Sequence, residues 1–278
     1  MTHSASYPIQ WNGATDPGRF RKTNEDAFLA LTFDAKVVQL LGKIGEANLD
    51  MGDFVFAVSD GMGGANAGEF GSRIAVDKIK ELLPKSLGML ASGMPRGEHD
   101  ILQELYDRIH REMVYMGQVY EECKGMGATL TMAWVSPGRI SYAHIGDSRL
   151  YYLPHANPMR QATRDHSYVG ALERMGKISA AQAKYHPKRH VINQAIGGNF
   201  HEAVPEFGVI EYEPGDRLLL CTDGVLQGCG PAMLEDKIRK TTAPDSHPSS
   251  SSSIAENIVK EARLNSGKDN ATALVVYL

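Results

Sequence analysis

Acidic residues recur where apolar, strand-like segments begin or end, and this recurrence is the strongest chemical signal in the sequence. The residues concerned are Glu25, Asp26, Asp60, Asp147, Asp223 and Asp269. A single Asp-Gly pair is usually a hairpin turn. After Asp60, however, the chain continues into a glycine-rich loop and a helical pattern instead of a returning strand. The recurrence therefore indicates a site that gathers carboxylates.

A divalent cation is the obvious stabiliser of such a gathering. Converging carboxylates without a partner repel one another, and their pKa values rise. Oxygen ligands suit Mg²⁺, Mn²⁺ or Ca²⁺ better than zinc or copper, and the spacing does not match an EF-hand loop. Glycine follows both Asp60 and Asp223, which allows the backbone to approach an ion closely. We predict that the loop after Asp60 holds metal, which in turn holds phosphate or water.

A dinucleotide-binding loop is the competing interpretation of the same glycines. After Gly61 and Gly63, the third glycine of the G-x-G-x-x-G fingerprint would fall at Asn66. Asp60 also places a negative charge where the pyrophosphate would sit. Both features argue against a nucleotide fold.

Strands and helices alternate along the chain in a pattern typical of a mixed fold. Apolar runs joined by turns predict antiparallel strands over residues 126–135, 140–153, 216–225 and 270–278, with a hairpin at Ser136-Pro137-Gly138. Apolar residues at spacings of three and four predict helices over residues 68–83 and 101–123. Ser253 and Glu256 form a capping box for a third helix, which should stop near Gly267.

Two segments differ from this pattern. Residues 167–190 are locally basic and predict two short helices, the second starting at the Ser179/Gln182 capping pair; they are a solvated face or a flap over a site. Residues 245–253 are serine-rich and predict a flexible surface loop. Residues 34–52 are longer than a tight hairpin needs, and the sequence indicates no role for them. No linker divides the chain, so we expect a single domain over residues 1–278.

Composition excludes several classes of protein. A net charge of -4 with no basic cluster argues against nucleic acid as a partner. No apolar stretch approaches the roughly 20 residues that span a membrane, and the N-terminal residues do not resemble a signal peptide. The three cysteines match no zinc pattern and are expected to be reduced and buried. We therefore expect a cytoplasmic protein, monomeric because no large apolar stripe is evident.

Seven short motifs occur in an order that resembles the metal-dependent protein phosphatase family, the type 2C serine/threonine phosphatases, in its bacterial single-domain form. The resemblance runs from Arg21 to the C-terminus. Each motif is weak alone, but seven in order are specific. They are RKTNED, SDGMGG, GATL, GDSRLY, TRDHS, LCTDGV and KDNATALVV.

The resemblance implies an α+β fold, an α-β-β-α sandwich of two antiparallel sheets flanked by helices, with two Mn²⁺ or Mg²⁺ ions at one end. By the same resemblance, Asp60 would bridge both ions. Glu25 and the Gly61 carbonyl would complete the site of one ion, and Asp223 and Asp269 would complete that of the other. Asp147 would share a weaker third ion with Asp223. Asp26 and Asn270 would orient ligands or bound waters.

The implied reaction is hydrolysis of phosphoserine and phosphothreonine in proteins by a hydroxide held between the two ions. Arg21 occupies the position of the family's phosphate-binding arginine and would offset charge in the transition state. One position departs from the pattern of some members, which have histidine after Asp-Gly. Here it is Met62, so the leaving group must obtain its proton elsewhere.

Two other functions compete with a protein phosphatase. A non-catalytic adaptor or sensor that binds phosphoproteins would share the fold, but it would not need the full set of acidic residues together with Arg21. A phosphatase of small phosphoesters would share the site. We expect phosphoprotein substrates, those of a cognate serine/threonine kinase.

Overall fold

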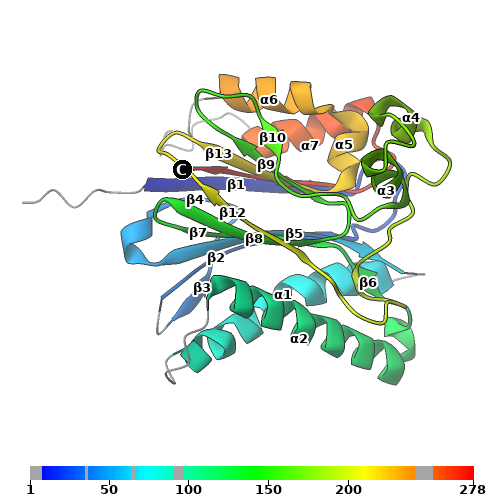
Figure 1. The fold of residues 1–278 in the computed structure, drawn as a ribbon, viewed down its shortest axis with the longest axis horizontal. Coiled ribbons are helices and arrows are strands. Elements are labelled where there is room, and N and C mark those ends of the chain that lie inside the picture. The colour runs from blue at the N-terminus through cyan, green and yellow to red at the C-terminus, as the bar shows by residue number, and fades with distance from the viewer. Residues whose placement is uncertain (1–7, 35–36, 64–66, 91–96, 242–252) are drawn as a thin grey trace, which may run out of the picture.

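Two antiparallel sheets lie face to face in the computed structural model, with helices on both outer faces (Figure 1). The structure describes residues 8–34, 37–63, 67–90, 97–241 and 253–278. Every strand pair described is antiparallel. This α-β-β-α arrangement confirms the predicted fold class. The serine-rich segment 245–253 lies outside the described residues apart from Ser253.

The first sheet has six strands in the order β10-β9-β13-β14-β1-β4. Its strands, in that order, are Arg160–Gln161, Arg149–Leu153, Arg217–Cys221, Ala271–Tyr277, Pro8–Asp16 and Ile44–Asn48. Helices cover its outer face (Figure 1). They are α5 Asp223–Gly228, α6 Pro231–Lys240 and α7 Ile254–Asn265.

The second sheet has eight strands, of which six follow the order β11-β6-β5-β7-β8-β12, while β2 pairs with β5 and with β3. Its strands are β2 Asp26–Phe33, β3 Val38–Leu40, β5 Asp53–Met62, β6 Gly127–Ala128, β7 Leu130–Ser136, β8 Arg139–Ile145, β11 Ile196–Gly197 and β12 Glu206–Glu211. Helices α1 Ala67–Leu90 and α2 Glu98–Val119 cover its outer face (Figure 1). Two 3₁₀ turns, Leu49–Met51 and Glu121–Cys123, complete these layers.

Alternating burial along the strands creates three apolar layers. One packs between the sheets and includes Phe54, Phe56 and Leu220, all buried. The second packs the inner side of α1 and α2 against one sheet, and the third packs α5 to α7 against the other. A strand with both faces covered is apolar throughout, which is why β14 is buried at every position. Within the described part of the chain, no helix has the length and apolarity to cross a membrane.

Residues 34–52 have a structural role that the sequence does not reveal. Strand β3 adds to the second sheet beside β2, and β4 adds to the first sheet beside β1. Between these strands the Trp11 indole N–H donates to the Gly42 carbonyl at 2.9 Å, and the Leu41 N–H donates to the Ala30 carbonyl at 2.9 Å. The segment therefore crosses from one sheet to the other and covers the edge of the sandwich on that side.

The flap-like segment forms the two short helices that the sequence predicts. Helix α3 spans Tyr168–Arg174, and α4 spans Ala180–Tyr185 with the capping box of Ser179 and Gln182 in place. In contrast, the apolar run that predicts a strand through Val225 ends earlier. Strand β13 stops at Cys221, and Asp223 begins α5, because the Val225 N–H bonds back to the Thr222 carbonyl at 3.2 Å.

Candidate metal centre

Strand pairing places two of the predicted acidic residues directly opposite each other. The β2–β5 register aligns Asp26 with Asp60. Opposite residues of an antiparallel pair point to the same face, so these like charges are neighbours. The Asp60 N–H donates to the Thr129 hydroxyl at 2.9 Å, and Thr222 donates its hydroxyl hydrogen to the Asp26 carboxylate at 2.7 Å. Hydrogen bonds thus hold both acidic residues in place despite their repulsion.

Glu25 and the Gly61 carbonyl face a common point beside the first turn of α1. A methyl group added at Gly68 would lie 2.9 Å from Glu25 Oε1 and 3.2 Å from the Gly61 oxygen. The Gly61 N–H also donates to the Glu25 carbonyl at 2.9 Å. Only glycine at position 68 leaves this space open. The two oxygens predicted to share an ion therefore converge on a small cradle.

Asp223 and Asp269 are brought together by close packing of α5 against the start of β14. A methyl group added at Gly224 would lie 1.8 Å from the Asn270 carbonyl oxygen, so only glycine permits this approach. The Gln227 side-chain amide donates to Asp223 at 3.1 Å and to Asp269 at 3.4 Å. The two carboxylates therefore face each other across a single amide group.

Asp147 lies in the turn between β8 and β9, where the chain passes from the second sheet to the first. Its Oδ1 is buried and has no hydrogen-bond partner among the described residues. Burial and then repulsion from Asp223 and Asp165 raise the pKa of Asp147 well above its ordinary value, although Arg149 opposes the rise. A buried carboxylate oxygen without a partner is costly, and a cation beside it would remove that cost.

Burial is the main cause of raised pKa values across the cluster, and mutual repulsion is the second. Burial raises the pKa of Asp60 well above its ordinary value, and four neighbouring aspartates add to the effect. Burial raises the pKa of Asp26 from 3.8 to about 7, against the opposing hydrogen bonds of Thr222 and Thr272. The pKa values of Asp223 and Glu25 also rise, first through burial. These shifts are the pattern expected of anionic ligands that need a cation.

Arg21 lies at the rim of the cluster, with its side chain 48% exposed. Its guanidinium group is 2.8 Å from the Asp269 carboxylate and 3.9 Å from that of Glu25. Asn270 fixes the loop that carries it: the Asn270 amide donates to the Pro17 and Thr23 carbonyls, and its oxygen accepts from the Glu25 N–H at 2.8 Å. Asn270 thus positions the loop that carries both Arg21 and Glu25.

The structure gathers the predicted acidic residues without closing them into a shell. Among the described residues, no three His, Cys, Asp or Glu side chains are placed so that they could hold one ion as they lie. Arg21 and Gln227 instead contact the carboxylates. The contacts of Gln227 and Gly68 with the acidic residues were not predicted from the sequence. The spacing of four between Asp223 and Gln227 would have pointed to contact only if α5 had been recognised as a helix.

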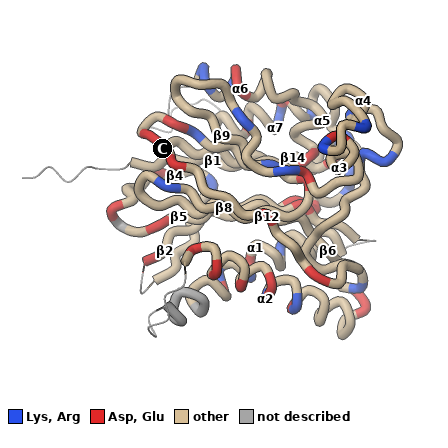
Figure 2. The backbone as a smooth tube through the Cα atoms, viewed as in Figure 1, with Lys and Arg blue, Asp and Glu red and all other residues tan. Residues whose placement is uncertain are grey.

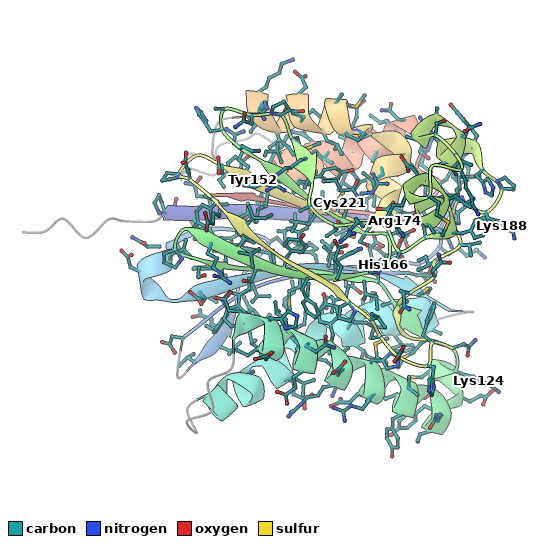
Figure 3. All side chains as sticks on the ribbon, viewed as in Figure 1. Lys124, Tyr152, His166, Arg174, Lys188 and Cys221 are labelled. Atoms are coloured by element: carbon teal, nitrogen blue, oxygen red, sulfur yellow. The ribbon has the colours of Figure 1, made fainter. Side chains whose placement is uncertain are left out.

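Neither the cysteines nor His144 offers an alternative nucleophile or base. All three cysteines are free and buried, and burial raises the pKa of Cys221, at the end of β13, to about 12 (Figure 3). His144 is held between the Thr131 hydroxyl at 2.8 Å and the Arg164 carbonyl at 3.2 Å, and burial lowers its pKa to about 3. A thiol and an imidazole so placed stay neutral near pH 7.

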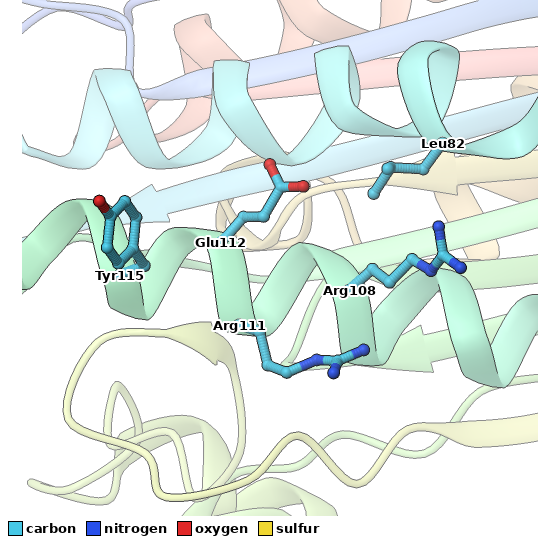
Figure 4. Close-up of a pocket in the computed structure, with 5 residues that line it drawn as sticks. All are labelled: Leu82, Arg108, Arg111, Glu112 and Tyr115. Carbon is cyan, nitrogen blue, oxygen red and sulfur yellow. The ribbon is translucent and has the colours of Figure 1, made fainter. Parts of the chain in front are cut away.

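A hollow on the outer side of α1 and α2 lies away from the acidic cluster, on the helical face of the second sheet (Figure 4). Leu82 of α1 and Arg108, Arg111, Glu112 and Tyr115 of α2 line it. Glu112 is paired with Lys78. The hollow has none of the predicted site residues, so the chemistry is placed at the strand ends.

Known proteins share both the sequence pattern and the fold. The family model described as protein phosphatase 2C matches residues 43–265. The serine/threonine phosphatase stp of Listeria innocua is 31% identical over 263 residues, which cover 94% of this chain and 93% of that protein. The crystal structure of the Mycobacterium tuberculosis serine/threonine phosphatase PstP/Ppp has 25% identity and a TM-score of 0.76, with 98% of this chain and 99% of that chain covered. The phosphatase MsPP of Mycobacterium smegmatis, solved with cacodylate, has 29% identity and a TM-score of 0.70, with 96% and 97% covered.

The α-β-β-α sandwich and the relatives just described place the chain among the metal-dependent phosphatases. The chain belongs to the protein phosphatase 2C family. The predicted family and the predicted reaction class, metal-dependent dephosphorylation of serine and threonine in proteins, are confirmed at the level of the family.

Proposed function

We propose that this chain removes phosphate from phosphoserine and phosphothreonine in proteins and that the acidic cluster at the strand ends is its active site. The observation that carries this proposal is the gathering of acidic side chains: Asp26 lies opposite Asp60, and the Gln227 amide bonds to both Asp223 and Asp269. Carboxylates that repel one another in a partly buried site are destabilising unless a cation binds them. The Gly68 cradle and the unpartnered Asp147 oxygen fit such a cation.

The proposed ligands are those that the family resemblance implies. Asp60 would serve both of two Mn²⁺ or Mg²⁺ ions, Glu25 and the Gly61 carbonyl would complete one site, and Asp223 and Asp269 would complete the other. Asp147, together with Asp223, would hold a weaker third ion. Bound ions of this kind lower the pKa of a bound water and offset charge on phosphoryl oxygens.

The chain's own residues bind and orient the phosphoryl group. A guanidinium group has five N–H donors, and only some of them face the carboxylates in this structure. The exposed part of Arg21 can therefore hold two phosphoryl oxygens at once. Asn270 keeps the Arg21 loop in place, and Asp26 holds Thr222 next to Asp223. These two residues position the groups that touch the substrate.

The cellular setting is proposed on weaker grounds. We propose a cytoplasmic monomer that opposes a cognate serine/threonine kinase. Free buried cysteines support a reducing compartment. The adaptor hypothesis has no observation in its favour, because the complete set of acidic residues and Arg21 is present at one end of the sandwich.

The test is phosphate release from a phosphothreonine peptide with MnCl₂, with MgCl₂ and after EDTA. We expect metal-dependent release that Asp60→Asn abolishes, while Asp236→Asn, an exposed aspartate on α6, leaves it unchanged. Phosphate release from free phosphorylated metabolites is measured in parallel, for comparison with the peptide. Faster release from metabolites than from the peptide would contradict a protein phosphatase, and no release from either would support the adaptor.

A further inference from the structure

The flap, residues 167–190, carries a charge opposite to that of the whole chain. The chain has a net charge of -4. Between Tyr168 and Ile192 the acidic residue is Glu173, and the basic residues are Arg174, Lys177, Lys184, Lys188 and Arg189. Figure 2 shows basic residues gathered over α3 and α4. The flap is therefore a basic surface on an acidic protein.

The flap concentrates several exposed cations without ion pairs in one short segment. On the other helices some exposed cations are paired, as Lys240 is with Asp236 and Arg73 with Glu69, whereas Lys80 and Lys260 form no ion pair with any described residue. Lys177, Lys184, Lys188 and Arg189 are exposed and form no ion pair with any described residue. Their positive charge is thus not neutralised within the described part of the chain.

Two of these ammonium groups lie over aromatic rings. The Lys188 nitrogen lies 4.9 Å from the centre of the Tyr168 ring, and the Lys184 nitrogen lies 5.9 Å from that of Tyr185. Tyr185 is itself 78% exposed and Met175 is 66% exposed. Tyrosine and methionine are enriched in protein–protein interfaces.

The flap is anchored beside the acidic cluster. The His166 N–H donates to the Gly146 carbonyl at 2.7 Å, next to Asp147, and the Tyr168 N–H donates to the Val191 carbonyl at 2.8 Å. Figure 3 labels His166 and Arg174 where the flap joins the sheets and Lys188 at its outer end.

We propose that the flap binds the chain next to the phosphorylated residue and selects phosphosites flanked by acidic residues. This inference rests on the proposed function. A peptide whose phosphate reaches Asp60 and Arg21 passes beside the flap, because the flap leaves the sheets next to Asp147. Complementary charge of this kind mainly raises the rate of productive encounter and is weakened by salt.

The experiment compares three phosphothreonine peptides of equal length whose flanking residues are acidic, neutral or basic, with Mn²⁺ present. For the full chain at low salt, we expect kcat/KM to be about tenfold higher for the acidic than for the neutral peptide, and lowest for the basic one. Raising the salt concentration should shrink this ratio. The triple variant Lys184→Gln, Lys188→Gln and Arg189→Gln should reduce the ratio to about twofold or less.

Two controls separate charge at the flap from other effects. Lys80→Gln, Lys240→Gln and Lys260→Gln together remove the same charge from exposed helical sites and should leave the ratio unchanged. The triple variant Lys184→Arg, Lys188→Arg and Arg189→Lys keeps the positive charge and should keep the ratio of the two kcat/KM values. Because each ratio is taken within one variant, a partial loss of folding changes both rates and not the preference.

Four results would overturn the inference. Equal rates for the three peptides would refute selection by charge while leaving the phosphatase proposal intact. An acidic preference that survives in the flap variant would place selectivity elsewhere in the protein. If that variant instead lost only its binding to an RNA oligonucleotide or to anionic vesicles, with its peptide preference unchanged, the flap cations would serve another partner. Hydrolysis of none of the peptides would refute the proposed function itself, and the inference with it.

Discussion

Asp26 offers the clearest way to measure the electrostatic cost of the candidate site. It is 7% exposed and lies opposite Asp60 in the β2–β5 pair. Asp26→Asn removes the charge, keeps the shape and leaves an oxygen that can still accept the Thr222 hydroxyl. We expect this substitution to stabilise the metal-free protein while it impairs activity. Such a result would separate the demands of folding from those of function.

The pH dependence has a definite sign. Because the folded protein raises the pKa of Asp26 from 3.8 to about 7, it holds the proton more tightly than the unfolded chain does. The resulting stabilisation is full below about pH 4, declines as the pH rises, and is lost above about pH 7. A shift of this size corresponds to about 4 kcal/mol. Since the neighbouring aspartates share the effect, we expect Asp26→Asn to raise the free energy of unfolding by about 1–3 kcal/mol at pH 8.

Urea unfolding in EDTA, at pH values between about 4 and 8, measures this difference. Asp26→Asn should match the wild type at the acidic end and exceed it at the alkaline end, whereas Asp236→Asn should match it throughout. A variant that is equally stable or less stable than the wild type at pH 8 would refute the reasoning. It would show that Asp26 is stabilised as an anion by the fold alone.

Two further substitutions test individual roles. Arg21→Ala should lower kcat/KM on a phosphothreonine peptide about 30-fold, the loss expected for a charged hydrogen-bond partner worth about 2 kcal/mol. Lys22→Ala, at the exposed neighbouring position, is the control and should have little effect. Gly68→Ala should weaken Mn²⁺ binding in calorimetry without unfolding the protein, because the added methyl would lie 2.8 Å from Glu25 Cδ and displace that side chain. Gly97→Ala, where a methyl meets nothing within 4 Å, is its control. Full activity in Arg21→Ala, or unchanged affinity in Gly68→Ala, would argue against the respective role.

Local sequence signals predicted those parts of the fold that local interactions determine. The capping boxes at Ser179 and Ser253 mark the starts of α4 and α7, because each pairs a hydroxyl with a side chain three residues on. The Pro137-Gly138 turn marks the β7–β8 hairpin, because Gly138 takes the positive φ that the turn requires. Helix α5 was not predicted, because its short sequence continues the apolar run of β13 without a break in composition.

Features that depend on tertiary packing could not be predicted from sequence. Apolar patterning does not reveal that β8 and β9 belong to different sheets or that residues 34–52 cross between them. The acidic side chains of the site could be predicted because each stands within two residues of a strand end. The Gly68 cradle and the Gln227 bridge depend on which elements pack together, and only the structure shows this.

Calorimetric titration of the EDTA-stripped protein with Mn²⁺, for the wild type and for Asp60→Asn, tests the central claim most directly. The proposed ligand set predicts two ions bound tightly to the wild type and a large loss of affinity at both sites in Asp60→Asn, since Asp60 would contact both ions. Unchanged stoichiometry and affinity in Asp60→Asn, with circular dichroism showing an intact fold, would contradict a metal centre built on this residue.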